Sequence, residues 1–158
     1  MSPGPTAERE FLCAGIEKLR AVLEMVGFRY EPGDVGVSCG GAFAAGFFRR
    51  GDLEIGLIVR SRNELGTPNY TQGHGYASHE DLFRELGHDG EARLVPGDFP
   101  SHVARDGSDP FDALEGDLRN TILPALSASE VDFREAIARA HRKHMDELLR
   151  GLRGNVSQ

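Results

Sequence analysis

The sequence predicts an α+β domain in which a small antiparallel β-sheet packs against helices. Three observations favour this class: helical spacing of apolar residues near both ends, two adjacent apolar segments joined by a short turn near residue 50, and a length of 158 residues. A chain of this size forms one ordinary domain and buries about 70% of its unfolded surface. We expect that domain to span residues 7–152, between a disordered lead (1–6) and a flexible tail (153–158).

The first helix is predicted from about Ala7 to Val26. Apolar residues recur there at intervals of three and four, which places them on one helix face. Gly27 stands where a left-handed C-terminal cap belongs, and Phe28 can then fold back on Leu23. The apolar face consists of Leu12, Ile16, Leu19, Leu23 and Val26.

The sheet is predicted around a hairpin that spans residues 42–60. Its turn lies at residues 49–52, where Gly51 would supply the positive φ of a type I turn with a glycine bulge. Because a lone hairpin is only marginally stable, at least one further strand must pair with it. Residues 35–39 are the first candidate for that strand and residues 92–95 are the second.

Pro32 and Gly33 are the central residues of a predicted type II turn between short strands at 28–30 and 35–39. The run of small residues from Gly40 to Gly46 allows close approach by a helix of the same chain or by a second subunit, and we favour the internal helix.

Apolar residues occur on both faces of the predicted hairpin. This indicates either helices on both sides of the sheet or contact with a partner chain. Alternate residues of the second strand line one face, namely Leu53, Ile55, Leu57 and Val59, and the candidates for the other face are Phe48 and Ile58.

Three further helices are predicted after the sheet. Ser78 has the character of an N-cap for a short middle helix that ends at Gly87. Asp109 at the N-cap and Pro110 in the first turn begin the first of two longer C-terminal helices. The second runs from about Ser129 to Leu152.

Composition limits the classes of function. A net charge of −7 argues against nucleic-acid and acidic-membrane partners. No apolar segment approaches the roughly 18 residues that span a bilayer, and the N-terminus lacks signal-peptide character, so we expect a cytoplasmic protein. Cys13 and Cys39 are interpreted as buried free thiols. The usual phosphate-loop, dinucleotide, nucleophile-elbow and zinc-helix motifs do not occur in the sequence.

Four of the six histidines lie in two stretches predicted to be irregular, residues 63–78 and 88–108, or at the edges of the helix between them: His74, His79, His88 and His102. His74, His79 and His88 are weak candidates for a catalytic or metal-assisted role, and His79 at a helix start is biased toward the neutral ring. Their spacing matches no common ligand set, so the competing interpretation is that they are solvated loop residues.

The long predicted loop at residues 63–78 is the main candidate for recognition. Its aromatic and imidazole side chains suit a binding surface, but the same rings could instead pack on the sheet. An arginine pair before it could hold an anionic group, or could form a salt bridge to Glu64. The candidate binding residues are Arg60, Arg62, Tyr70, His74, Tyr76 and His79.

His141 and His144 lie one turn apart on the last predicted helix, beside an apolar stripe. The sequence offers no clear third ligand there, so a helix-edge pair bordering the core is favoured over a metal site. The stripe consists of Ile137, Ala140, Leu148 and Leu152.

Taken together, these residues predict a small binding module that recognises an unknown protein or small molecule through residues 63–78, without cofactor or metal. The alternative is a hydrolase or related enzyme that uses the loop histidines, with or without a divalent metal. A homodimer built on the small-residue strand is a third hypothesis.

Overall fold

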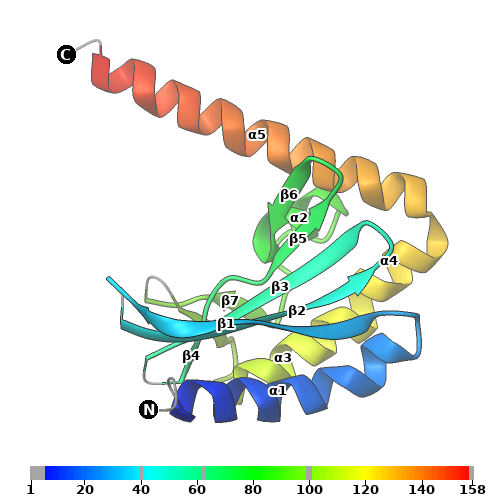
Figure 1. Cartoon of the computed structure of the whole chain (residues 1–158). Helices are drawn as coiled ribbons and strands as arrows, with labels where there is room; N and C mark the ends of the chain where they lie inside the picture. The colour runs from blue at the N-terminus through cyan, green and yellow to red at the C-terminus, as the bar shows by residue number, and fades with distance from the viewer. Residues whose placement is uncertain (1–5, 40, 62, 99–100, 157–158) are drawn as a thin grey trace.

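The computed structural model describes residues 6–39, 41–61, 63–98 and 101–156, and it confirms the α+β class (Figure 1). An antiparallel sheet of eight strands is combined with helices from both ends of the chain. In chain order the elements are α1 (Thr6–Glu24), β1 (Arg29–Ser38), β2 (Gly41–Arg50), β3 (Leu53–Arg60), β4 (Glu64–Leu65), β5 (Asn69–Gln72), β6 (Gly75–Ser78), α2 (His79–Glu85), β7 (Leu94–Pro96), β8 (His102–Ala104), α3 (Pro110–Asp117), a π-helical turn (Leu118–Ile122), α4 (Leu123–Ala128) and α5 (Glu130–Val156).

The sheet runs in the order β1-β2-β3-β4-β8-β7, and the β5–β6 hairpin is added beside β3. The first half of β3 pairs with β5 and its second half pairs with β4, so both strands form hydrogen bonds with the same edge of β3. Residues 35–38 belong to β1 and pair with β2, which confirms the first candidate for the further strand. Residues 94–96 also join the sheet, at its far end beside β8.

Helix α1 confirms the predicted amphipathic pattern. Leu12, Ile16, Leu19 and Leu23 are at most 2% exposed, so one face of α1 belongs to the core. Gly27 has a φ of +93°, and the N–H of Phe28 donates to the Leu23 carbonyl at 3.1 Å. These are the bonds of a glycine C-terminal cap.

The type II turn predicted at Pro32-Gly33 is wrong, because β1 continues through these residues. A register shift between Pro32 and Val35 absorbs them as a bulge within one strand. Proline is tolerated there since β1 lies at the edge of the sheet and the missing N–H breaks no inner ladder.

The hairpin of β2 and β3 is present, but its turn differs from the prediction. Arg50 pairs with Leu53, which leaves a two-residue turn of Gly51 and Asp52. Gly51, the first of the two turn residues, has a φ of +59°, and Asp52, the second, has a negative φ. A type I turn with a glycine bulge would instead need the positive φ at the end of the turn. Positive φ at the first central residue is typical of a type II′ turn.

The core face of β3 is formed by Leu53, Ile55, Leu57 and Val59, as predicted. Phe48 was expected on the opposite face, and this is wrong: Phe48 is directly paired with Ile55, so both side chains point into the core. The other face carries Ile58, which is half-buried together with Phe43 and Phe47.

The small-residue strand is covered from within the chain. Ala44 is fully buried, and β2 lies against α1, as favoured from the sequence. A Cβ on Gly46 would stand 2.5 Å from the Tyr30 hydroxyl, so only glycine leaves room for that side chain. Gly40 lies outside the described residues.

The long loop predicted at residues 63–78 is wrong, because most of it is β4, β5 and β6. Tyr70 and Ala77 face each other across the hairpin and both enter the core. Thr71 and Tyr76, the next pair across the hairpin, are exposed, and this alternation is the period-two pattern of a strand. Gly73, with a φ of +61°, closes the hairpin.

The prediction of buried thiols is wrong as well: Cys13 and Cys39 are both exposed. Cys13 follows Leu12 but lies off the buried stripe of α1, and Cys39 lies in the turn after β1. Within the described part of the chain, no helix combines the length and hydrophobicity needed to cross a membrane.

The predicted helix starts after Ser78 and Asp109 are confirmed. The Ser78 hydroxyl accepts from the Asp81 N–H at 3.2 Å, and the Asp109 carboxylate accepts from the Phe111 N–H at 2.8 Å. Helix α5 extends beyond the predicted end at Leu152 to Val156. Most of the predicted lead, residues 1–5, lies outside the described residues, whereas residues 153–156 of the predicted tail continue α5.

Candidate functional site

The two halves of α5 have different surroundings. In its first half, Phe133, Ala136, Ile137 and Ala140 are at most 2% exposed and complete the core. Beyond His144 every described side chain, from residue 145 to residue 154, is exposed. We call residues 145–156 the arm; Figure 1 shows it leaving the body of the molecule as a straight continuation of α5.

A cluster of ion pairs anchors α5 just before the arm begins. Glu85 of α2 has a side chain only 7% exposed and receives Arg139 at 3.0 Å and Lys143 on its other oxygen. The Arg139 guanidinium also donates to the Glu85 carbonyl. Desolvation by burial acts to raise the pKa of Glu85, but the hydrogen bonds from Lys143 and Arg139 outweigh it and hold that pKa below its ordinary value.

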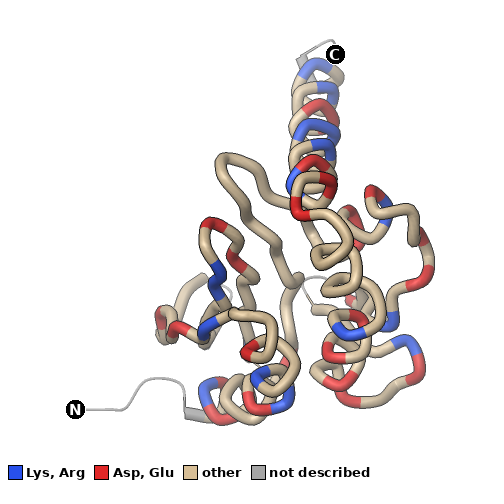
Figure 2. The backbone as a smooth tube through the Cα atoms, turned by 90° about the vertical axis from the view of Figure 1, so that its right-hand side faces the viewer, with Lys and Arg blue, Asp and Glu red and all other residues tan. Residues whose placement is uncertain are grey.

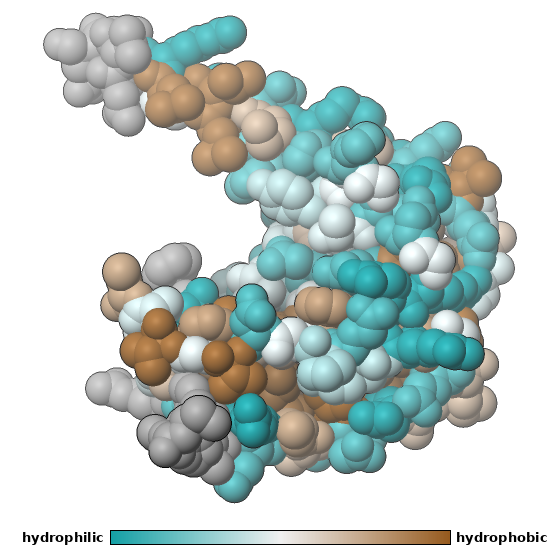
Figure 3. Space-filling model, in the orientation of Figure 1, coloured by the Kyte–Doolittle hydropathy of each residue, from teal (hydrophilic) through white to brown (hydrophobic). Residues whose placement is uncertain are grey.

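The arm carries an exposed apolar stripe, which we call the arm stripe. Its side chains are 40–62% exposed, far more than the side chains of the first half of the helix. In the space-filling view, hydrophobic residues of the arm border a hollow between the arm and the body (Figure 3). The arm stripe consists of Met145, Leu148, Leu149 and Leu152.

The arm stripe continues the side of α5 that contacts the β5–β6 hairpin. Gly75 lies against His141 and Ala138 of α5. Met145 follows Ala138 by seven residues, and Leu148 follows His141 by seven, so each points in nearly the same direction as its predecessor. The stripe is therefore the hairpin-contacting face of the helix, prolonged past the hairpin.

Tyr76 joins the hairpin to the base of the arm. Its ring packs edge-on against His141, with centroids 4.8 Å apart, and against His144, at 5.6 Å. The ring remains 38% exposed, so it adds an aromatic surface next to the arm stripe. His74, at the tip of the same hairpin, is also exposed.

Two other predicted binding residues lie inside the core. Tyr70 and His79 have no measurable exposure, and the Tyr70 hydroxyl is 2.9 Å from His79 Nδ1. His79 Nε2 is 2.8 Å from a carboxylate oxygen of Asp117, which is 3% exposed. Since a carboxylate only accepts, Nε2 carries a hydrogen, and in the neutral ring Nδ1 then accepts from the tyrosine hydroxyl.

Backbone groups complete this buried network. Asp117 also accepts the N–H groups of Arg93 and Leu94, at 2.8 and 2.9 Å. Burial, together with the carboxylates of Asp117 and Glu80, raises the pKa of Tyr70 well above its ordinary value. The network links β5, α2, α3 and β7, and no atom of Tyr70 or His79 reaches the surface where a substrate could meet it.

The remaining histidines do not join His79. His88 is exposed and pairs with Glu91 at 2.6 Å. His102 is buried against the carboxylate of Glu80 and lies 3.4 Å from the Thr67 hydroxyl. Among the described residues, no group of three histidine, cysteine or acidic side chains is arranged to hold a metal ion.

The predicted arginine fork is only half described. Arg60 is partly buried at the end of β3, opposite Phe43 on one side and Glu64 on the other. Arg62 lies outside the described residues, so the structure neither brings the two arginines together nor separates them.

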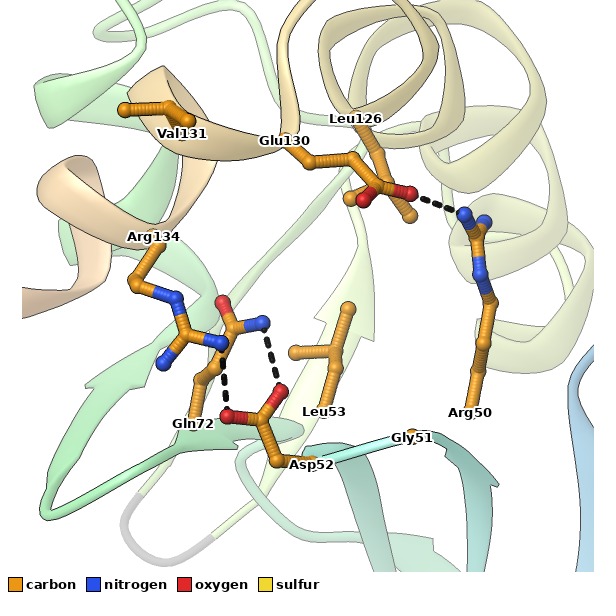
Figure 4. A pocket seen from close by; sticks show the side chains of 9 residues that line it. All are labelled: Arg50, Gly51, Asp52, Leu53, Gln72, Leu126, Glu130, Val131 and Arg134. Carbon is orange, nitrogen blue, oxygen red and sulfur yellow. Dashed lines mark hydrogen bonds and ion pairs between the residues drawn. The ribbon is translucent and has the colours of Figure 1, made fainter.

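An open pocket of about 280 Å³ lies beside the β2–β3 turn (Figure 4). Its charged groups already have partners: Arg50 pairs with Glu130, and Arg134 pairs with Asp52 at 2.6 Å. Gln72 donates to Asp52, and its own carbonyl oxygen is buried without a hydrogen-bond partner among the described residues. The pocket therefore offers one vacant acceptor and two ion pairs that a ligand would have to displace.

Comparisons of this chain with models of known families, with curated proteins and with solved structures gave no significant match. The physical features of the chain therefore carry the functional argument alone.

Proposed function

We propose that this protein is a non-enzymatic interaction module that binds a protein partner through the arm stripe and the adjoining ring of Tyr76. The observation that carries this proposal is the stripe of four apolar side chains, each 40–62% exposed, on a helix that has left the body of the molecule. Large apolar side chains grouped on one exposed face are typical of protein-binding surfaces.

The position of the stripe supports the same function. The hairpin and the Glu85 ion pairs hold the base of α5 in place, so the arm is presented in a fixed direction. The hollow beside it leaves room for a second helix or strand (Figure 3). Helix-in-groove and helix-pair contacts use apolar anchors at spacings of three and four, as in Met145, Leu148 and Leu152.

Only two of the binding residues expected within and beside residues 63–78 belong to this proposal. Tyr76 and His74 keep their exposed positions next to α5, whereas Tyr70 and His79 serve the core. The enzyme alternative finds no support in the loop histidines, because His79 is buried and pairs with Asp117, whereas His88 is exposed and pairs with Glu91.

The test compares immobilised wild-type chain with the variant Leu148→Glu/Leu152→Glu. Arg142→Glu, which changes a charge outside the stripe, serves as the matched control. We expect specific proteins to be retained by wild type and by the control, and to be lost with the double variant. Identical retained proteins in all three samples would contradict a binding role for the arm stripe.

A further inference from the structure

We propose that this protein also binds a small organic acid between Arg93 and Arg105, in a cavity beside β7, β8 and the start of α3. The acid carries a hydroxyl or an amino group next to its carboxylate. This inference goes beyond the proposed function, because the cavity shares no residue with the arm stripe and neither proposal needs the other.

The cavity is open and has a volume of about 550 Å³. Sites for small molecules usually measure roughly 300–1,000 Å³, so its size suits such a ligand. Ala92 and Ala113 supply apolar lining. The charged side chains of the lining are Glu91, Arg93, Arg105, Asp106 and Asp112.

The two arginines of the cavity are neighbours across the sheet. The Arg105 N–H donates to the Arg93 carbonyl at 2.8 Å, which continues the β7–β8 ladder one pair beyond Leu94 and Ala104. Residues directly opposite in an antiparallel ladder have Cβ atoms about 5 Å apart, and like charges at such a pair are destabilising. An anion bound between the two guanidinium groups would remove that repulsion.

Both guanidinium groups have donors to spare. Arg105 uses Nε and Nη2 for the carbonyls of Ala92 and Gly90, at 3.1–3.3 Å, and its Nη1 has no partner among the described residues. The Arg93 guanidinium has neither a hydrogen bond nor an ion pair with any described residue. Its backbone is nevertheless fixed, since the Arg93 N–H donates to Asp117 at 2.8 Å.

Two of the three acidic side chains are paired with cations that do not line the cavity. Glu91 lies 2.6 Å from His88, and Asp112 lies 3.0 Å from Lys18. These pairs reduce the negative charge that a ligand would meet, and they leave each carboxylate with further acceptor capacity.

The third acid, Asp106, accepts from the Ser108 N–H at 3.0 Å and from the Ser108 hydroxyl at 2.6 Å. The Ser108 hydroxyl and N–H hold the pKa of Asp106 below its ordinary value, and the charge of Arg93 adds a smaller effect. Ser108, rather than Arg93, is therefore the direct partner of this carboxylate.

Gly116 of α3 provides the space in which the Arg93 side chain lies. A Cβ at residue 116 would stand 3.1 Å from Arg93 Nη1 and 3.3 Å from its Cδ. A larger residue at this position would therefore displace the guanidinium and leave its charge unchanged.

The charges of the lining select the class of ligand. A guanidinium binds a carboxylate through two parallel hydrogen bonds. A phosphate group would bring nearly two negative charges close to three carboxylates, so the singly charged carboxylate is favoured. The same three carboxylates can accept from a hydroxyl or an amino group of the ligand. Figure 2 shows basic and acidic positions intermixed along the described backbone, as they are in this lining.

The experiment is an NMR titration of the ¹⁵N-labelled full-length chain with L-lactate, L-alanine, propionate and inorganic phosphate. The three organic acids have the same carbon chain and differ only in the group next to the carboxylate. Each is added to about 50 mM at constant ionic strength, because salt screens charge pairs. We expect amide shifts confined to residues 91–93 and 105–116, with a Kd of roughly 1–10 mM for lactate or alanine. Propionate and phosphate should bind at least about threefold more weakly.

Two variants test the arginine and its position. Arg93→Gln should weaken binding at least about tenfold, since a charge-assisted pair is lost. Gly116→Ala should weaken it about fivefold by moving the guanidinium, while alanine is the better helix former and preserves α3. Arg142→Gln, which removes the same charge from an exposed position of α5, is the matched control and should bind as wild type does.

Absence of shifts around the cavity with all three organic acids would overturn the site, and so would an unchanged affinity in Arg93→Gln. Tighter binding of phosphate than of every organic acid would overturn the carboxylate assignment. Equal binding of propionate, lactate and alanine would overturn the role of the acidic side chains. The Leu148→Glu/Leu152→Glu variant should bind the acids as wild type does, so failure of this site and failure of the arm stripe are seen separately.

Discussion

The two halves of α5 show how one helix can carry two different roles. Residues 130–144 and the arm have the same amphipathic character, yet only the first half meets the hairpin, α2 and the core. Ile137 is 1% exposed and Leu148, eleven residues later on nearly the same side, is 49% exposed. The same kind of apolar stripe is therefore buried in the first half of α5 and exposed in the second, because the hairpin, α2 and the core cover only the first half.

The largest expected contrast concerns stability. Phe133→Ala should lower the free energy of unfolding by about 3–5 kcal/mol, because a ring that is 1% exposed leaves a cavity. Leu148→Ala should change it by less than about 0.5 kcal/mol. Urea unfolding of both variants checks this, and a cost above 1 kcal/mol for Leu148→Ala would mean that the arm packs on the body in solution.

The sequence predicted the body better than it predicted the arm. Spacing alone located α1, the β2–β3 hairpin and the caps at Ser78 and Asp109, because each depends on neighbours within a few residues. The stripe of Ile137, Ala140, Leu148 and Leu152 was also visible. What spacing could not give is the length of the hairpin that α5 packs against, and this length divides the stripe into buried and exposed parts.

The prediction that Tyr70 and His79 form a binding surface was wrong for the same kind of reason: it depends on a contact far away in the sequence. Tyr70 and His79 stood among glycines and polar residues, so their surroundings resembled a binding loop. Their burial depends on Asp117, 38 residues after His79, whose carboxylate accepts from the imidazole and from two backbone N–H groups. No local pattern records a partner at that separation. The one sequence signal of a hairpin was the pair of apolar residues Tyr70 and Ala77 on either side of the glycine-rich turn.

The second prediction concerns the anchor at the boundary between the two halves. Glu85→Gln should cost about 1 kcal/mol, since the hydrogen bonds to Arg139 and Lys143 lose their charge assistance. The folded pKa of Glu85 is lowered, so its contribution is present above the unfolded pKa of about 4.3 and is lost as pH falls through the folded value.

Unfolding measured from pH 7 to pH 3 therefore separates the two proteins. Wild type and Glu85→Gln should differ most near neutral pH and converge at the acid end. A difference that stays constant with pH would show that the substitution acts through packing and not through the carboxylate.

The third prediction concerns Tyr76, which touches both halves. Its ring is 38% exposed and contacts two histidines edge-on, so Tyr76→Ala should cost about 0.5–1.5 kcal/mol. His74→Ala, at the exposed hairpin tip, is the control and should be nearly silent. Thermal unfolding of both variants checks this, and a loss of 3 kcal/mol or more for Tyr76→Ala would place that ring in the core.

The smallest expected effect is the most direct test of the comparison: removal of the arm by a stop codon after His144. Every described side chain of residues 145–154 is exposed, so truncation uncovers no core residue and breaks none of the Glu85 ion pairs. We expect the free energy of unfolding of the body to change by less than about 0.5 kcal/mol. Hydrogen exchange of the full-length chain should agree, with fast exchange beyond residue 145 and strong protection around Ile137. A truncated chain that unfolds at markedly lower denaturant would show that the arm supports the body, and the distinction between the two halves of α5 would be lost.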